Sequence, residues 1–317
     1  MKIVFFGTPD FAVSSLEALL EAGHDIAAVV TAPDKPSGRG LQTSASAVKL
    51  FAVEKNLLVL QPERLKEEAF VSQLKAIHAD LFIVVAFRML PEIVWNMPKH
   101  GTYNLHASLL PKYRGAAPIN WAIINGDSET GITTFKLQHA IDTGDVLLQA
   151  RVSLNDTISA GELYGLLKTK GAELLVQTVK MIADHAQSGK ELPFVQQSDG
   201  IVSHAPKLNK ETGHINWHAT AQGIHNLVRG LHPAPSAWTT LHEGGKQHVI
   251  KIHRSRVKNT SSKSVVGKVT TDNKTHLTIL CGSGELDVLE LQAEGRKRMA
   301  VDEFLRGFKI SGDAYFE

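Results

Sequence analysis

The chain has 317 residues, enough for two domains with separate cores, and its 43% hydrophobic and 21% charged residues are typical of a globular protein in water. Its formal net charge of +2 excludes a strong field over the whole protein, so any contact with nucleic acid must come from local basic clusters. A single cysteine, Cys281, excludes an internal disulfide and a cysteine-based zinc site, and no apolar run approaches the ~20 residues of a membrane span, so we expect a cytoplasmic protein.

The first part of the chain alternates between strand-like and helix-like segments. Runs rich in β-branched and aromatic residues predict strands at residues 1–7, 24–31, 57–62, 80–87 and 102–107, and helical spacing marks residues 11–20 and 48–56. Residues 80–87 (DLFIVVAF) are continuously apolar, as in a central parallel strand that is buried on both faces. The alternation predicts an α/β fold with a Rossmann-like, open and mostly parallel sheet.

This sheet is predicted to end in two strands of more alternating type, at residues 131–138 and 145–154, followed by a long helix at residues 160–187. Turn-forming residues then gather, and we interpret residues 190–206 as a linker. The predicted domains are therefore residues 1–189 and residues 207–317.

The second predicted domain begins with a helix over residues 216–231 and continues with short, turn-separated strands before a final short helix. Strands at this spacing predict a small β-barrel. Cys281 lies in the apolar run HLTILCG, so a buried structural thiol is favoured over a nucleophile.

Two glycine-containing loops of the first domain suggest contact with phosphates. Gly7 to Asp10 lie where a phosphate loop would follow the first strand, but the G-x-G-x-x-G and P-loop glycines are absent, which favours a simple tight turn. The loop from Asp34 to Gly40 (DKPSGRG) is either a mobile surface loop or a basic loop that touches a polyanion through Arg39. The residues alone do not separate these alternatives.

Asn104, His106 and Ser108, in TYNLHASLLPKYRGAAP, form the sharpest candidate site. Side chains two residues apart on a strand point to the same face, and ligands of open α/β sheets bind beyond the carboxyl ends of the strands. A polar pair at the end of an apolar strand is costly to bury unless it has a function or is satisfied by backbone groups, and both explanations stay open at this point.

A carboxylate loop, Asp142 to Asp145, follows the neighbouring predicted strand. A carboxylate beside an imidazole orients the ring and favours its protonated form. Asn, His and Asp together need no serine or cysteine nucleophile, and they suit attack of an external amine on a carbonyl, with donors for the oxyanion and an acid–base pair for the protons.

The segments NLHASLLPKYRGAAPIN and IDTGD resemble the signature of the folate-dependent formyltransferases. Further similar segments are GTPDFAV, PDKPSGRG, NGDSETGITTF and SHAPKL, and the resemblance covers nearly the whole chain. The RGAAPIN run and the barrel point to the branch of the family that formylates methionyl-tRNA. The resemblance implies a formyl-transfer domain of formyltransferase fold and a second, OB-like barrel that binds tRNA. It implies transfer of a formyl group from 10-formyltetrahydrofolate to the methionine α-amine of charged initiator tRNA, without a metal.

Carried over by position, the resemblance implies three sets of site residues. The catalytic residues would be Asn104, His106 and Asp142, and the folate-contact run would be Ser108, Leu109, Leu110 and Pro111. The tRNA contacts would include Arg39, beside the acceptor end, and Lys207, in the linker. Further basic candidates are Lys112, Arg114, Lys210, Lys251, Arg254, Arg256, Lys258, Arg296, Lys297 and Arg298.

Some segments depart from the family pattern. Gln138-His139-Ala140 stands where many relatives have D-x-G. The run from Phe87 to Pro91, which in the family borders the pocket for the pterin ring of the folate, lacks the glycine that relatives often have there. The sequence therefore does not predict the shape of that pocket. Other formyl acceptors, a sugar-nucleotide amine or glycinamide ribonucleotide, stay possible, as does a non-catalytic RNA-binding module. We expect a monomer without membrane contact.

Overall fold

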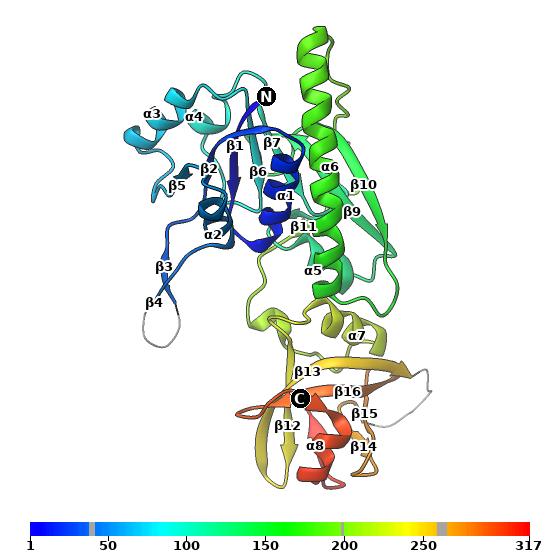
Figure 1. Cartoon of the computed structure of the whole chain (residues 1–317). Coiled ribbons are helices and arrows are strands. Elements are labelled where there is room, and N and C mark those ends of the chain that lie inside the picture. Colours follow the sequence, from blue (N-terminus) through cyan, green and yellow to red (C-terminus); the bar gives the residue numbers. More distant parts are fainter. Residues whose placement is uncertain (38–41, 198–199, 259–264) are drawn as a thin grey trace. The chain divides into compact units, whose positions relative to one another are not determined.

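The computed structural model describes residues 1–37, 42–197, 200–258 and 265–317. Its first sheet has the strand order β10-β9-β7-β6-β1-β2-β5 (Figure 1). The strands are β1 (Lys2–Gly7), β2 (Asp25–Val30), β5 (Val59–Leu60), β6 (Leu81–Val85), β7 (Thr102–His106), β9 (Glu129–Lys136) and β10 (Val146–Ser153). All pairings from β5 to β7 are parallel and β9 is antiparallel to β7, which confirms the predicted Rossmann-like, mostly parallel sheet.

Among the described residues, this part of the chain also forms the helices α1 (Asp10–Glu21), α2 (Ala47–Glu54), α3 (Glu68–Ile77), α4 (Glu92–Trp95), α5 (Pro118–Ile124) and α6 (Ala160–Ser188). The predicted helices correspond to α1, α2 and α6, whereas α3 to α5 were not predicted. β3 (Lys35–Ser37) and β4 (Gln42–Ser44) pair with each other, and β8 (Arg114–Gly115) pairs with β11 (His204–Ala205).

Helix α6 packs against one face of β7 and leaves the opposite face uncovered by this helix. A Cβ on Gly171 of α6 would lie 2.8 Å from Ile132 and 3.0 Å from Leu105, so the helix approaches β7 and β9 closely on that face. Side chains alternate along a strand, so Asn104 and His106 lie on the face opposite Leu105. Both were predicted on one face, and the strand assignment confirms it.

The second sheet has the order β14-β15-β16-β13-β12-β18, with β17 beside β16, and neighbouring strands run antiparallel. The strands are β12 (Ala237–Glu243), β13 (Lys246–Lys258), β14 (Val269–Thr271), β15 (Leu277–Leu280), β16 (Glu285–Ala293), β17 (Met299–Ala300) and β18 (Tyr315–Phe316). An antiparallel bridge between Lys268 and Tyr315 joins the two ends of this order. The sheet therefore nearly closes on itself, which confirms the predicted small barrel.

The barrel core is apolar and includes α7 (Ala221–Gly230) and α8 (Val301–Gly307). Cys281 is 4% exposed and belongs to this core, which confirms the prediction of a buried cysteine, and its burial raises the pKa of the thiol to about 12.

The prediction of a single helix over residues 216–231 was wrong at its beginning. Asn216 accepts a hydrogen bond from the amide of His218 through its own side chain, which favours a turn. Thr220 then caps the helix by accepting from the amide of Gly223, so α7 begins at Ala221.

The described chain forms two units. The first comprises Met1–Gly115, Gly131–Val152 and Tyr164–His204, and the second comprises Ala116–Thr130, Ser153–Leu163 and Ala205–Glu317. The linear division at residues 189 and 207 stays a prediction. Within the described ranges, no helix is both long and apolar enough to cross a bilayer.

Candidate active site

The candidate site lies at the carboxyl end of β7. Asn104 pairs in register with Val84 of β6 and Phe135 of β9, and His106 pairs with Thr133. His106 is only 6% exposed, whereas Asn104 is half-buried, and its side chain makes no hydrogen bond with any residue that the structure describes. The Asn104 amide therefore keeps its donors available for a ligand.

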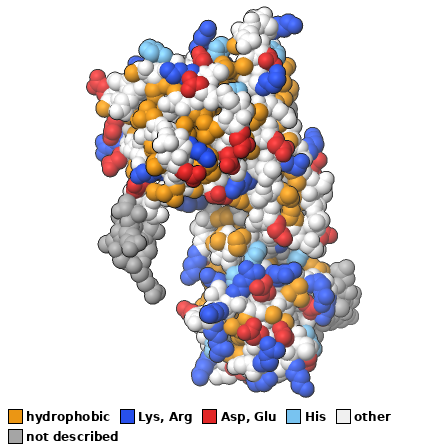
Figure 2. Space-filling model, viewed as in Figure 1, with side chains coloured by type: hydrophobic (Ala, Val, Ile, Leu, Met, Phe, Trp, Pro, Cys, Tyr) orange, Lys and Arg blue, Asp and Glu red, His pale blue; other side chains and the backbone are white. Residues whose placement is uncertain are grey.

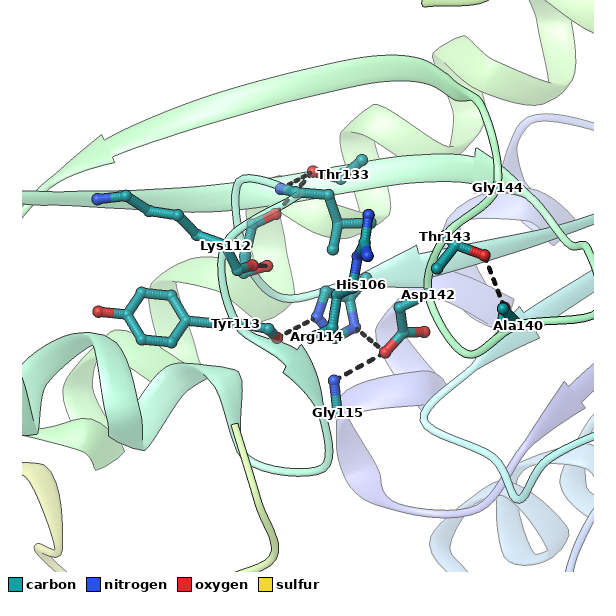
Figure 3. Close-up of polar contacts among 12 residues, drawn as sticks. His106, Lys112, Tyr113, Arg114, Gly115, Thr133, Ala140, Asp142, Thr143 and Gly144 are labelled. Atoms are coloured by element: carbon teal, nitrogen blue, oxygen red, sulfur yellow. Dashed lines mark hydrogen bonds and ion pairs between the residues drawn. The ribbon is translucent and has the colours of Figure 1, made fainter. Parts of the chain in front are cut away.

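His106 lies between a backbone carbonyl and a carboxylate (Figure 3). Its Nε2 donates to the Tyr113 carbonyl oxygen at 2.8 Å, which fixes the proton on that nitrogen because a carbonyl can only accept. Its Nδ1 faces Asp142 Oδ2 at 3.8 Å, within ion-pair range but beyond a hydrogen bond. Each nitrogen of the His106 ring therefore faces an oxygen atom, the Tyr113 carbonyl oxygen on one side and the Asp142 carboxylate on the other.

Asp142 belongs to the loop between β9 and β10, beside the strand that carries His106. Its Oδ2 accepts from the amide of Gly115 at 2.8 Å, and its side chain is only 12% exposed. Its φ of 54° lies in the left-handed region, which few residues other than glycine adopt, so the surrounding contacts must hold the loop in shape. The predicted carboxylate therefore does lie beside the predicted histidine.

Ser108 to Pro111 form a turn that continues β7. Ser108 and Leu110 are buried, and the Ser108 hydroxyl donates to the Lys112 carbonyl at 2.6 Å within the turn. Thr133 of β9 holds the same turn, since its hydroxyl donates to the Ser108 carbonyl at 2.7 Å and accepts from the amide of Leu110 at 3.2 Å. Sequence reasoning had missed Thr133, because a threonine inside an apolar strand carries no signal of its own.

A cavity of about 620 Å³ lies beside the run from Phe87 to Pro91, the run that the resemblance associates with the pterin pocket. Its lining residues are Glu63, Arg64, Leu65, Lys66, Arg88, Met89, Pro91, Glu92 and Ile93. Arg88 donates to the carbonyl of Glu63 at 2.7 Å and also bonds the carbonyl of Pro62, so it fastens the two sides of the cavity together. His139 contacts Glu92 at 3.3 Å, which places the Asp142 loop next to this cavity.

The two tRNA contacts predicted from the resemblance, Arg39 and Lys207, are not among the described residues of the first unit. Arg39 lies outside the described residues. Lys207 is exposed and belongs to the second unit. Of the other basic candidates, Arg114 bonds Gln197, Arg256 and Lys258 pair with Asp287, and Arg298 pairs with Glu290. Among the described residues, no group of three or more His, Cys, Asp or Glu side chains is arranged to hold a metal ion.

Comparison with known proteins gives matches over almost the whole chain. Residues 1–179 match the model of the formyl transferase family, and residues 207–309 match the formyl transferase C-terminal domain. A methionyl-tRNA formyltransferase of Bacteroides thetaiotaomicron is 49% identical over 99% of this chain and 98% of its own length. Its counterpart in Parabacteroides distasonis is 48% identical over 98% of this chain and 96% of its own length.

Solved structures share the fold at lower identity. An N-formyltransferase of Helicobacter canadensis, solved with folinic acid and dTDP-3-aminofucose, has a TM-score of 0.65 at 19% identity, over 94% of this chain and 100% of that one. The sugar 3N-formyl transferase WlaRD has a TM-score of 0.66 at 21% identity, over 94% of this chain and 99% of that one. Both family models and the full-length relatives agree, and the chain therefore belongs to the formyl transferase family, among the methionyl-tRNA formyltransferases.

Proposed function

We propose that this protein transfers the formyl group of 10-formyltetrahydrofolate to the α-amine of initiator methionyl-tRNA, as a monomer in the cytoplasm. The observation that carries the proposal is the site at the end of β7, where the unpaired amide of Asn104 lies on the same strand face as His106, with Asp142 at 3.8 Å. Membership of the family supplies the reaction class, and the relatives named methionyl-tRNA formyltransferase supply the acceptor.

The folate substrate would bind along the run from Ser108 to Pro111 and into the cavity beside Met89. A folate has an aromatic, hydrogen-bonding ring system and a carboxylate-bearing tail. The cavity lining carries three cationic side chains (Arg64, Lys66 and Arg88) against two carboxylates (Glu63 and Glu92), so its net positive charge would favour such a tail. Ser108 and Leu110 are buried, so they would act by holding the turn in shape, while Leu109 and Pro111 are half-buried at its surface.

The chemistry follows from the three polar residues. The amine attacks the formyl carbon, so a new C–N bond forms while the carbonyl oxygen becomes an oxyanion. The Asn104 amide would donate a hydrogen bond to that oxyanion. By comparison with other oxyanion donors, this bond would lower the activation free energy by about 3 kcal/mol. His106, held by the Tyr113 carbonyl and facing Asp142, would move the amine proton toward N10 of the folate as the C–N10 bond breaks.

The acceptor tRNA requires cationic side chains that are not already in ion pairs. Five of the basic candidates named from the sequence are exposed in the second unit and make no side-chain hydrogen bond or salt bridge with a described residue, namely Lys207, Lys251, Arg254, Arg296 and Lys297. Figure 2 shows Lys and Arg side chains spread over the barrel, with acidic ones between them. We propose that these five, with Arg39, contact the tRNA phosphates, and that binding therefore weakens steeply with added salt.

An acceptor panel tests the function directly. Tetrahydrofolate release is followed spectroscopically with charged initiator tRNA, with the same tRNA uncharged, with a sugar-nucleotide amine and with glycinamide ribonucleotide. Turnover with charged initiator tRNA alone is the expected result. Turnover with a small amine instead would reassign the acceptor, and binding of tRNA without turnover would favour the non-catalytic module.

A further inference from the structure

Gln197 joins the two segments that surround His106. Its Nε2 donates to the carbonyl oxygens of Asp142 and Gly144, each at 2.8 Å. Its Oε1 accepts from the guanidinium of Arg114, at 2.7 Å from Nη2 and 3.2 Å from Nε. One amide thus uses both of its donor hydrogens and its acceptor to connect the Asp142 loop with Arg114.

The chain on either side of Gln197 is anchored to the same two segments. Val195 and Val146, where β10 begins, exchange two backbone hydrogen bonds of 2.8 Å. Ser203 accepts from the amide of Tyr113 through its hydroxyl at 2.9 Å and from the amide of Arg114 through its carbonyl at 2.9 Å. These contacts fasten the segment next to the residues that bond His106 and Asp142.

The backbone of both segments needs such support. Asp142 and Tyr113 have φ angles of 54° and 60°, in the left-handed region that side chains other than glycine rarely occupy. Gln197 bonds the carbonyl of Asp142 itself, and through Arg114 it reaches the residue next to Tyr113. Strained residues persist only where surrounding contacts determine them, and Gln197 supplies such contacts to both segments.

We propose that Gln197 is a positioning residue of the formyl-transfer site, which acts with Arg114 to hold Asp142 at its distance from His106. The segment predicted as a linker, residues 190–206, would then be part of the catalytic machinery, and a catalytic domain ending at residue 189 would be impaired. The inference rests on the proposed function.

The test compares Gln197→Ala with Gln196→Ala. Gln196 is an exposed neighbour of the same residue type that makes no hydrogen bond with any described residue. A misplacement of about 1 Å costs on the order of 10²-fold in rate, so kcat of Gln197→Ala should fall about 10²-fold while KM for the folate stays unchanged. In Gln197→Glu a carboxylate oxygen would face the two carbonyl oxygens, so kcat of this variant should fall at least as far. Loss of kcat below about threefold in both variants, or an equal loss in Gln196→Ala, overturns the proposal.

A double-mutant cycle separates positioning from a general structural role. In an Asp142→Asn background, Gln197→Ala should lower kcat less than about threefold further, because Gln197 acts through Asp142. If the fold-losses in kcat of the two single variants multiply in the double variant, Gln197 does not act through Asp142, and the proposal is overturned.

Hydrogen exchange gives an answer that does not depend on turnover. The amide of Gly115, which donates to Asp142, should exchange faster in Gln197→Ala than in Gln196→Ala. Unchanged exchange overturns the proposal even if the protein proves to formylate no tRNA. Faster exchange in a protein without formyl transfer would instead refute the proposed function alone.

Discussion

Gly144, in the Asp142 loop, is the position at which the smallest substitution should have the largest effect. A Cβ built there lies 1.6 Å from the carbonyl oxygen of Lys136 and 3.1 Å from the ring of Phe135. Contacts under 3.0 Å essentially never occur, so Gly144→Ala must move the two chain segments apart by at least 1.4 Å. Lys136 is paired with Tyr103 in the sheet, so the loop rather than the strand will move.

This displacement sets the expected magnitude. Moving the loop by more than 1 Å takes Asp142 away from His106, and displacements of that size cost on the order of 10²-fold in rate. Overpacking of this kind also lowers the free energy of unfolding by about 1–3 kcal/mol.

The measurements are kcat for tetrahydrofolate release and the free energy of unfolding from denaturant titration. Gly165→Ala is the matched control, because Gly165 lies in α6 and a Cβ there meets nothing within 4 Å. It should leave kcat unchanged and raise the free energy of unfolding by about 0.5–1 kcal/mol, the difference between alanine and glycine in a helix. If Gly144→Ala retains the kcat of Gly165→Ala, the described loop geometry does not matter for the reaction.

Three further substitutions or reagents test other parts of the structure. Thr133→Val should lower the free energy of unfolding by about 2–3 kcal/mol, because it strands buried partners of the hydroxyl, and a loss below about 0.5 kcal/mol in denaturant titration would contradict this. Burial acts to raise the pKa of Asp287, but hydrogen bonds from Lys258, Thr278 and Arg256 bring it below its ordinary value. Asp287 therefore stabilises the fold above its unfolded pKa of about 3.9, and this contribution is lost as the pH falls through the lower folded value. Asp287→Asn should lower stability by about 1–2 kcal/mol at pH 7, and a deficit that stays constant down to pH 2 would refute the pairing. With a pKa of about 12, the Cys281 thiol should resist a thiol reagent at pH 8 until the protein unfolds, and rapid labelling of the native protein would show that it is not buried.

The sequence predicted the elements whose signal is local. The apolar run of β6 and the polar pair of β7 follow from side-chain alternation, and adjacency of the neighbouring strand brought Asp142 to His106. The contacts that support this pair could not be predicted, because they depend on how distant segments fold together. Gln197 is 55 residues from Asp142 in sequence, and it lies in a stretch whose composition indicates only a linker.

A second kind of failure came from competition between local patterns. Helical spacing extended the predicted helix back to Asn216. In the structure the side chains of Asn216 and Thr220 accept hydrogen bonds from nearby backbone amides, and α7 begins only at Ala221. The basic residues proposed for tRNA binding also show what sequence alone does not reveal. Counting basic residues cannot reveal that Arg256 and Lys258 are already paired with Asp287.

The most direct test of the account is single-turnover formyl transfer to charged initiator tRNA by His106→Ala, with folate affinity measured in parallel. We expect the transfer rate to fall by about 10²–10⁴-fold, the usual contribution of a general acid–base residue, while the dissociation constant for the folate stays within about twofold of the unmodified protein. A variant that transfers the formyl group at a near-normal rate would contradict the assignment of the Asn104, His106 and Asp142 site.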